Sequence, residues 1–214
     1  MSVHLAKGMR DILPGELRKR RSMIERIQHV FESFGFEPLQ TPAVERIETL
    51  MGKYGDEGNK LIFRILARGK AGEQGKADSA LRYDLTVPLA RVVAMNPQIP
   101  LPFKRYQIQP VWRADRPQRG RFREFYQCDV DVVGTENGLA EAECIAIVHQ
   151  ALLALGFAEF KIRLNDRRIL RAMVSEIGAL DREVDILVAI DKLDKIGEKG
   201  VRENLGEQGF SSEQ

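Results

Sequence analysis

Apolar residues near the start of the chain recur at the spacing of a helix. Between Pro14 and Phe36 they stand among charged residues at roughly helical intervals: Leu17, Ile24, Ile27, Val30, Phe31 and Phe34. This spacing gathers the apolar side chains on one face of an amphipathic helix, and Gly35 is typical of the residue that ends one. Pro38 and Pro42 then flank a short segment that we expect to be extended.

The middle of the chain alternates apolar runs with turn residues. Residues 61–66 predict a strand, and residues 81–84 predict a second strand. Between them, residues 67–79 contain three glycines and three basic residues, which predicts a turn or a flexible hairpin tip. A helix is expected to begin near Thr86 and to end before Asn96.

Two longer strands are predicted at about residues 103–114 and 121–133. The segment that joins them contains Pro and Gly, so the two strands are expected to form an antiparallel pair. A helix over about residues 139–155 and a strand over residues 160–164 follow, and from Asp166 onward the pattern predicts further helices. Strands grouped together and helices set apart favour an α+β fold over a doubly wound parallel sheet.

Composition places the chain among ordinary globular proteins. It has 214 residues, of which 43% are hydrophobic and 30% charged, which fits one domain or one domain and part of a second. No apolar run approaches the roughly 20 residues that cross a bilayer. The N-terminus has no apolar stretch long enough for a secretory signal, so we expect a cytoplasmic protein that does not bind a membrane. Cys128 and Cys144 are too few for a disulfide framework and have no metal-ligand spacing with histidine, so no metal site is expected.

The net charge of +2 conceals a difference between the two parts of the chain. Residues 1–134 carry 23 Lys and Arg against 16 Asp and Glu, whereas residues 135–214 carry 10 against 15. Such an asymmetry indicates that the first part meets phosphates or a polyanion and that the second is a solvated acidic region. Charged faces that are merely solvated are equally common, so the positions of the charges have to decide.

The strand predicted over residues 121–133 separates its side chains by chemistry. Its even positions are mostly apolar and include Cys128, which we expect to be a buried structural thiol. Its odd positions carry polar groups and one aromatic ring: Arg121, Arg123, Phe125, Gln127, Asp129, Asp131 and Val133. An antiparallel sheet with one solvated face would give the same alternation.

Arginines are concentrated around the turn between the two long strands. Residues 104–123 contain seven basic residues and one acidic residue, Asp115, and the five basic residues from Arg113 to Arg123 are all arginines. Guanidinium groups bind phosphate in a bidentate and permanently charged manner, so the cluster predicts a fixed phosphate site, with Phe125 as a stacking surface for a purine. Nucleic-acid binding would use the same residue types, but the carboxylates at the far end of the strand would repel a continuous polyanion.

The end of the other strand adds a smaller group of polar residues. Arg82, Asp84 and Thr86 are expected on one side, where a carboxylate and a hydroxyl can hold an ammonium group. The commoner explanation for Asp and Thr at this position is capping of the following helix. The chain has neither a P-loop nor a G-x-G-x-x-G motif after a strand, and it lacks a Ser/His/Asp or Cys/His signature.

Four segments together resemble the catalytic domain of histidyl-tRNA synthetases, a branch of the class II aminoacyl-tRNA synthetases. They are residues 7–14, the helix and Pro42 strand of the dimer-forming first class II motif, residues 81–88, and residues 112–131. The last segment resembles the second class II motif in the form particular to the histidine branch. Residues 164–170 and 191–195 resemble the family's continuation into its helical insertion, so the resemblance covers nearly the whole chain.

The resemblance implies roles for individual residues. For histidine binding it implies Asp84, Leu85, Thr86, Arg113, Gln127 and Asp131. For ATP binding, with Mg²⁺ accompanying the nucleotide, it implies Arg113, Asp115, Arg121, Arg123 and Phe125. Arg113 would be the catalytic residue, which clamps the α-phosphate of ATP and the carboxylate of histidine. Phe125 would lie against adenine, and Asp131 would accept a hydrogen bond from the imidazole.

The resemblance also implies an architecture and a function. Residues 1–170 would form a class II core that lacks the third class II motif, residues 171–214 would begin a helical insertion, and the anticodon-binding domain would be absent. We therefore expect the N-terminal part of a homodimeric enzyme that activates L-histidine with ATP and transfers it to tRNA(His), and we expect this chain alone not to charge tRNA. One alternative is a histidine-binding regulatory paralogue of ATP phosphoribosyltransferase. Another is a dimerising module that keeps only the fold.

Overall fold

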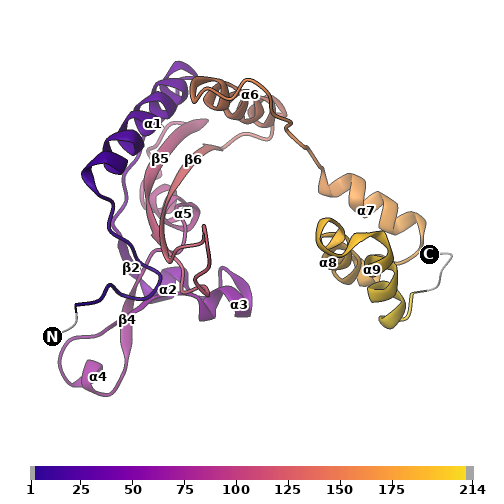
Figure 1. Cartoon of the computed structure of the whole chain (residues 1–214), viewed down its shortest axis with the longest axis horizontal. Helices are drawn as coiled ribbons and strands as arrows, with labels where there is room; N and C mark the ends of the chain where they lie inside the picture. The colour runs from indigo at the N-terminus through magenta and orange to yellow at the C-terminus, as the bar shows by residue number, and fades with distance from the viewer. Residues whose placement is uncertain (1–2, 211–214) are drawn as a thin grey trace. The chain divides into compact units, whose positions relative to one another are not determined.

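The computed structural model describes residues 3–210, and its contacts divide the chain into two compact units (Figure 1). The first unit is Met1–Glu159 and the second is Phe160–Gln214. The division precedes the core boundary expected after residue 170, which falls inside helix α7 (Arg167–Glu176).

The first unit contains two small sheets and the helices that surround them. Its helices are α1 (Pro14–Ser33), α2 (Ile47–Leu50), α3 (Gly55–Lys60), α4 (Lys70–Glu73), α5 (Thr86–Met95) and α6 (Leu139–Ala154). Its strands are β1 (Glu37–Pro38), β2 (Val44–Arg46), β3 (Arg64–Leu66), β4 (Ala77–Leu81), β5 (Phe103–Trp112) and β6 (Glu124–Val133). The three long helices and the two long strands agree with the sequence pattern, and the fold is α+β with antiparallel pairing flanked by helices.

The two shorter predicted strands differ from the structure. β3 begins only at Arg64, because Leu61 ends helix α3. β4 ends at Leu81, and residues 82–84 leave the sheet toward helix α5. The glycine-rich segment between these strands is a folded loop that contains the short helix α4.

The first sheet has the order β1-β5-β6 and the second has the order β2-β4-β3. β5 and β6 are antiparallel along their whole length, with Phe103 opposite Val133 at one end and Trp112 opposite Glu124 at the other. β1 is parallel to β5, and both pairs of the second sheet are antiparallel. The long β5–β6 hairpin therefore fixes which residues of the two strands face one another.

Helices α1 and α6 cover one face of the β5–β6 hairpin (Figure 1). The buried cluster between them contains Phe31, Phe36, Tyr106 and Ile147, and Val130 and Val132 of β6 pack against it. The even positions of β6 thus face the core at this end of the strand, as the alternation predicts. Further along the same face Cys128 is exposed, so the expectation of a buried thiol was wrong. On β6 the residues that pack against the apolar cluster are Val130 and Val132, and Cys128 is not among them.

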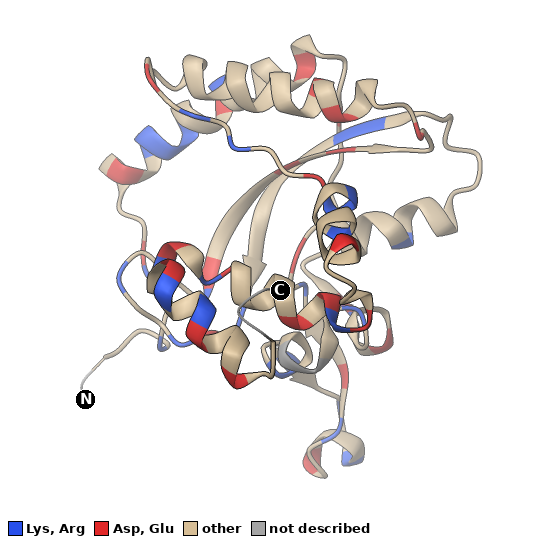
Figure 2. Cartoon of the chain, turned by 90° about the vertical axis from the view of Figure 1, so that its right-hand side faces the viewer, with Lys and Arg blue, Asp and Glu red and all other residues tan. Residues whose placement is uncertain are grey.

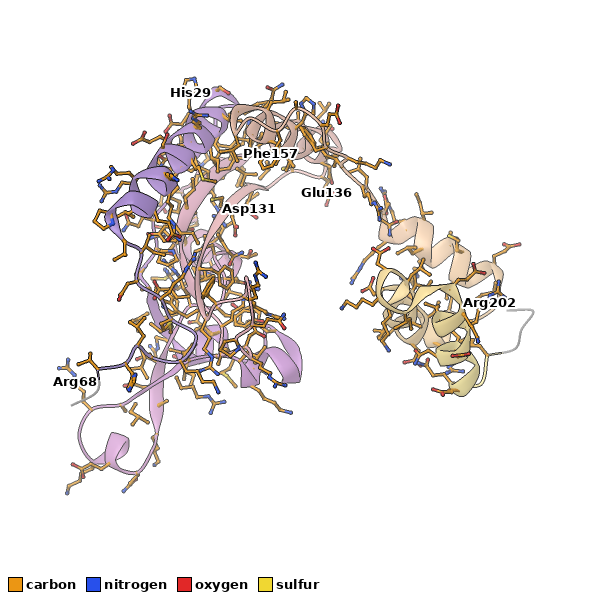
Figure 3. All side chains as sticks on the ribbon, in the orientation of Figure 1. His29, Arg68, Asp131, Glu136, Phe157 and Arg202 are labelled. Atoms are coloured by element: carbon orange, nitrogen blue, oxygen red, sulfur yellow. The ribbon has the colours of Figure 1, made fainter. Side chains whose placement is uncertain are left out.

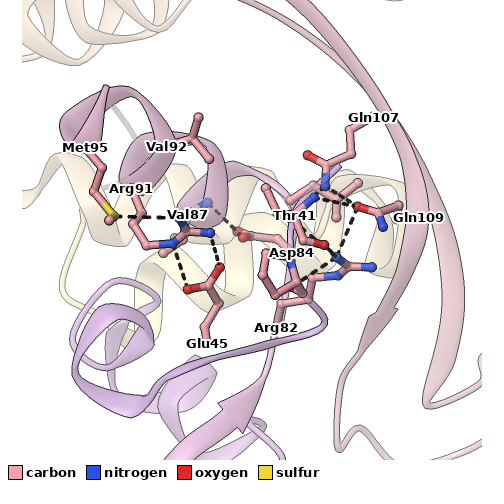
Figure 4. A network of polar contacts seen from close by, with 12 residues as sticks. Thr41, Glu45, Arg82, Asp84, Val87, Arg91, Val92, Met95, Gln107 and Gln109 are labelled. Atoms are coloured by element: carbon pink, nitrogen blue, oxygen red, sulfur yellow. Dashed lines mark hydrogen bonds and ion pairs between the residues drawn. The ribbon is translucent and has the colours of Figure 1, made fainter. Parts of the chain in front are cut away.

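A buried arginine ties the two sheets of the first unit together (Figure 4). The side chain of Arg82 is 1% exposed, and its guanidinium donates hydrogen bonds to the carbonyls of Thr41 (2.7 Å) and Pro110 (2.9 Å) and to Gln109 (3.1 Å). A buried guanidinium requires such partners, because an unpaired buried charge is costly. The network fixes the point at which the chain leaves β4 toward Asp84.

The second unit is a small helical assembly. Its elements are α7 (Arg167–Glu176), the 3₁₀ helix η1 (Leu180–Arg182), α8 (Glu183–Ile190) and α9 (Leu193–Glu207). Val174, Ala179 and Ile186 form its core, and Figure 2 shows acidic and basic residues interspersed along its helices. The strand expected over residues 160–164 was wrong: this run has no regular structure, and a strand needs a neighbour for its backbone groups.

Candidate functional site

Arg113, just past the end of β5, is held between the exit of β4 and the odd-numbered face of β6. Its Nε donates to the carbonyl of Tyr83 at 3.1 Å, and its Nη2 donates to Oε1 of Gln127 at 3.5 Å. Its guanidinium also lies over the rings of Tyr83 and Phe125, 4.5 Å and 5.1 Å from their centroids. Gln127 in turn donates to Oδ1 of Asp129 at 3.4 Å. The structure therefore brings Arg113, Phe125 and Gln127 together as the sequence predicts.

Asp84 lies at the start of α5 and caps that helix. Its Oδ1 accepts hydrogen bonds from the backbone N–H of Val87 and from the hydroxyl of Tyr54, both at 3.0 Å. Asp84 therefore caps α5, which is one of the two roles that the sequence left open, and the same oxygen also accepts the bond from Tyr54. Burial, together with the charge of Asp84, raises the pKa of the Tyr54 hydroxyl, so Tyr54 remains a neutral donor to the carboxylate.

The other two residues of this turn, Leu85 and Thr86, are placed differently from each other. Leu85 is fully buried, and its carbonyl accepts a hydrogen bond from Arg105 at 3.3 Å. Its side chain belongs to the core, so only its backbone is available to a ligand. Thr86 is exposed in the first turn of α5, where its hydroxyl makes no cap hydrogen bond.

Arg105 is the residue of this region that the sequence analysis missed. Its side chain is 0% exposed, and its Nη2 forms an ion pair with Oδ2 of Asp131 at 2.6 Å. Arg105 and Asp131 are directly opposite in the β5–β6 register, and Figure 3 shows Asp131 on β6. Counting outward from the predicted turn, residues 115–120, pairs Arg105 with Val130 instead, one residue away from its partner in the structure, so the sequence alone did not show this ion pair. In the candidate site, the carboxylate of Asp131 is paired with the buried guanidinium of Arg105.

Three carboxylates and two guanidinium groups interact within this site. Burial raises the pKa of Asp129, the charges of Asp131 and Asp84 raise it further, and those of Arg105 and Arg113 lower it. Burial also lowers the pKa of Arg105, while the carboxylates oppose that shift. Such a group of carboxylates can hold a cationic ligand group, and Arg113 beside it can hold a carboxylate or a phosphate.

The remaining predicted residues lie in the turn that joins β5 and β6. Arg121 is more than half exposed and pairs with Asp115 at 3.0 Å. Arg123 donates from Nε to the carbonyl of Asp115 at 2.9 Å and from Nη1 to the carbonyl of Lys7 at 3.4 Å. Gly8 approaches Arg123 so closely that a Cβ would lie 2.8 Å from its Cδ, and Gly8 also has a φ of +81°. Arg123 therefore fastens the N-terminal segment to the turn.

A cavity of about 510 Å³ lies at the other end of the hairpin, away from this turn. Lys104, Val132 and Glu143 are among the residues that line it, and none of the predicted site residues does. Lys104 and Glu143 form an ion pair at 2.6 Å there. The cavity is thus separate from the cluster around Arg113.

Comparison with solved structures identifies the class of protein that this fold and site define. The crystal structure of histidyl-tRNA synthetase from a Nostoc species superposes with a TM-score of 0.85 and 34% identity, covering 100% of this chain and 47% of that one. A Bacillus halodurans protein described as an ATP phosphoribosyltransferase regulatory subunit/histidyl-tRNA synthetase superposes with a TM-score of 0.80 and 25% identity, covering 99% of this chain and 54% of that one. The fold is that of an aminoacyl-tRNA synthetase.

Sequence comparison shows to which family within this class the chain belongs. The family model for histidyl-tRNA synthetase matches residues 8–210. The histidine–tRNA ligase of Cytophaga hutchinsonii is 48% identical over 98% of this chain and 50% of its own length, and that of Gloeobacter violaceus is 48% identical over 97% and 48%. The chain belongs to the histidyl-tRNA synthetase family, and it spans about half the length of the curated relatives that it matches.

The Arg105–Asp131 pair predicts a strong energetic coupling. Arg105→Met should lower the free energy of unfolding by about 3 kcal/mol or more, because it leaves a half-buried carboxylate without its cation. The double variant Arg105→Met/Asp131→Leu should recover much of that loss. Urea unfolding of the two single variants and the double variant measures the coupling. The exposed pair Lys199–Glu203, at 3.9 Å, is the control and should show none. Strict additivity at Arg105 and Asp131 would contradict the structure.

The raised pKa of Asp129 predicts a particular pH dependence. Because burial raises this pKa above its unfolded value of about 3.9, the folded state binds the extra proton, and ionisation costs stability as the pH rises through the folded value. Asp129→Asn removes that cost. The melting temperature of Asp129→Asn minus that of the wild type should therefore increase as the pH rises from about 4 to about 7. A difference that is constant or that shrinks with pH would refute the assignment.

Proposed function

We propose that this chain forms the part of a histidine–tRNA ligase that binds histidine and ATP. In the whole protein, ATP would activate L-histidine to histidyl-adenylate, and the histidyl group would then pass to tRNA(His). The observation that carries the proposal is the position of Arg113, within reach of Gln127 on one side and stacked on Phe125 on the other. Membership of the family supports it.

The proposed reaction is an in-line displacement at phosphorus. A carboxylate oxygen of histidine attacks the α-phosphorus of ATP, the bond to the bridging oxygen breaks, and pyrophosphate leaves. The guanidinium of Arg113 would bind both the attacking carboxylate and the α-phosphate, where charge accumulates. Losing one such preorganised donor typically costs about 10²–10³ in rate.

The carboxylates would recognise the rest of the amino acid. Asp84, with Thr86 and Gln127, would bind the α-ammonium group, and Asp131 would accept a hydrogen bond from the imidazole N–H. The buried Arg105 supports this role for Asp131, because the ion pair holds the carboxylate in one place. Recognition of a ring by hydrogen bonds can discriminate by about 10⁴–10⁵, which makes a separate editing site unnecessary.

The nucleotide would lie along the odd-numbered face of β6 toward the turn. Phe125 would stack on adenine, while Asp115, Arg121 and Arg123 would position the nucleotide; of these Arg121 is the most accessible. Mg²⁺ would arrive with ATP and be bound largely by its phosphates.

The proposal extends to the assembly of the whole protein. We infer a cytoplasmic homodimer, with tRNA(His) as its partner and with a helical insertion that begins at about residue 171. Apolar side chains exposed on the first class II motif support the dimer: Met23 on α1 is 49% exposed and Val44 on β2 is 47% exposed. Among the described helices, none combines the length and the apolar character that a membrane span requires.

A regulatory protein is the second candidate, because the Bacillus halodurans neighbour carries both descriptions in its name. Such a protein would bind histidine without activating it. It would have no use for a phosphate-binding arginine stacked on an adenine-binding ring, and both Arg113 and Phe125 are present here in contact. The ligase is therefore the function that the geometry favours.

Two substitutions separate these functions. Asp131→Ala should weaken histidine binding by about 10- to 100-fold and leave ATP binding nearly unchanged, because it removes a charge-assisted hydrogen bond to the ring. Arg113→Ala should weaken ATP binding and abolish histidine-dependent ATP–pyrophosphate exchange. Titration calorimetry and the exchange assay measure both effects, with the exposed Arg64→Ala as the control.

Three outcomes would contradict the proposal in different ways. Histidine binding without any ATP binding would identify a regulator. Binding of neither ligand would leave a module that keeps only the fold. Small and equal effects of Asp131→Ala and Arg113→Ala would mean that this face of β6 is merely solvated.

A further inference from the structure

The loop between β3 and β4 projects from the second sheet as a folded unit (Figure 1). We call residues 67–76 the tip loop. The backbone N–H of Ala67 donates to the carbonyl of Lys76 at 2.9 Å, and the N–H of Lys76 donates to the carbonyl of Ala71 at 3.0 Å. A Cβ on Gly72 would lie 1.8 Å from the carbonyl oxygen of Ala67, so the loop closes only with glycine there. The loop therefore has a fixed shape.

The tip loop and its base carry an unneutralised positive charge. Four basic residues are exposed there: Arg64, Arg68, Lys70 and Lys76. Glu73 in the loop and the exposed Asp78 on β4 at its base are the acidic residues there, so residues 64–78 carry a net charge of +2. No ion pair joins any of the four to a carboxylate whose side chain the structure describes. Figure 2 shows the short helix α4 projecting at the lowest point of the chain, and Figure 3 shows Arg68 directed away from the sheet.

The tip loop lies apart from the proposed histidine and ATP site. The residues of that site belong to β5, β6, the turn between them and the start of α5, whereas the tip loop lies beyond the last paired residues of β3 and β4, Leu66 and Ala77. Arg113, Asp84 and Asp131 form their hydrogen bonds and ion pair with residues outside the tip loop. Its charge has no part in binding histidine or ATP.

We infer that the tip loop binds the phosphate backbone of an RNA. Arginine and lysine side chains on a fixed loop suit this ligand, because phosphate contacts supply most of the affinity and position a nucleic acid without reading its sequence. An anionic membrane is disfavoured, since the tip loop has no apolar side chain larger than alanine to insert among lipids. The choice of RNA rests on the proposed function, in which the final acceptor is a tRNA.

The test compares two triple variants of this chain. Arg68→Ala/Lys70→Ala/Lys76→Ala removes three charges from the tip loop. The control, Arg18→Ala/Lys19→Ala/Arg21→Ala, removes three exposed charges from α1. Fluorescence anisotropy measures binding of a labelled tRNA(His) transcript at several salt concentrations. The tip-loop variant should lose about tenfold or more in affinity at low salt, and its slope of log K against log salt should fall by about 2 to 3. The control should lose much less.

A further variant separates charge from shape. Gly72→Ala keeps every charge but forces the loop open, so it should weaken RNA binding while the circular dichroism spectrum of the chain stays unchanged.

Wild-type affinity and salt slope in the tip-loop variant would overturn the inference, as would a wild-type chain that does not bind the transcript. So would equal losses in the tip-loop and α1 variants, or binding to anionic vesicles that depends on the tip loop while RNA binding does not. Histidine binding, measured on the same variants, should be unaffected. If the wild type binds RNA through the tip loop but does not bind histidine, the proposed function fails and the inference stands.

Discussion

The arrangement of the candidate site depends on one constraint: the fully buried guanidinium of Arg105 must have a counter-charge. The β5–β6 register supplies it by placing Asp131 directly across from Arg105. A slip of one residue would turn Asp131 to the opposite face and leave the arginine unpaired inside the protein, at a large cost in free energy. The same register sets Gln127 and Phe125 on the face that Arg113 contacts. The ion pair therefore helps to specify the positions of side chains that it does not touch.

The charged side chains around the Arg105–Asp131 pair suit the binding of a ligand better than they suit the stability of the fold. Asp84, Asp129 and Asp131 interact with one another and with Arg105 and Arg113, and burial makes the ionised form of Asp129 costly. A core built for stability alone would use fewer charges here. Three carboxylates beside the guanidinium of Arg113 suit a ligand that has a cationic end and an anionic end. An amino acid has both, and its activation requires the anionic end to meet a phosphate.

The sequence predicted what depends on local periodicity. The amphipathic helix α1, the helix α5 and the alternating face of β6 all follow from spacing alone. What failed depends on distant neighbours. Residues 160–164 have the composition of a strand but no strand beside them, and Cys128 lies on the even-numbered face of β6 but outside the apolar cluster. Arg105 looked like another surface cation of a basic segment, and only its cross-strand partner shows otherwise.

We propose that one wall of side chains binds an amino acid and a nucleotide at adjacent positions. The decisive experiment is a crystal structure of the chain with a non-hydrolysable analogue of histidyl-adenylate. We expect the phosphate mimic against Arg113, the ammonium group against Asp84, the imidazole against Asp131 and the adenine on Phe125. An analogue bound elsewhere, for example in the cavity beside Lys104 and Glu143, or bound with its ring turned away from Asp131, would contradict it.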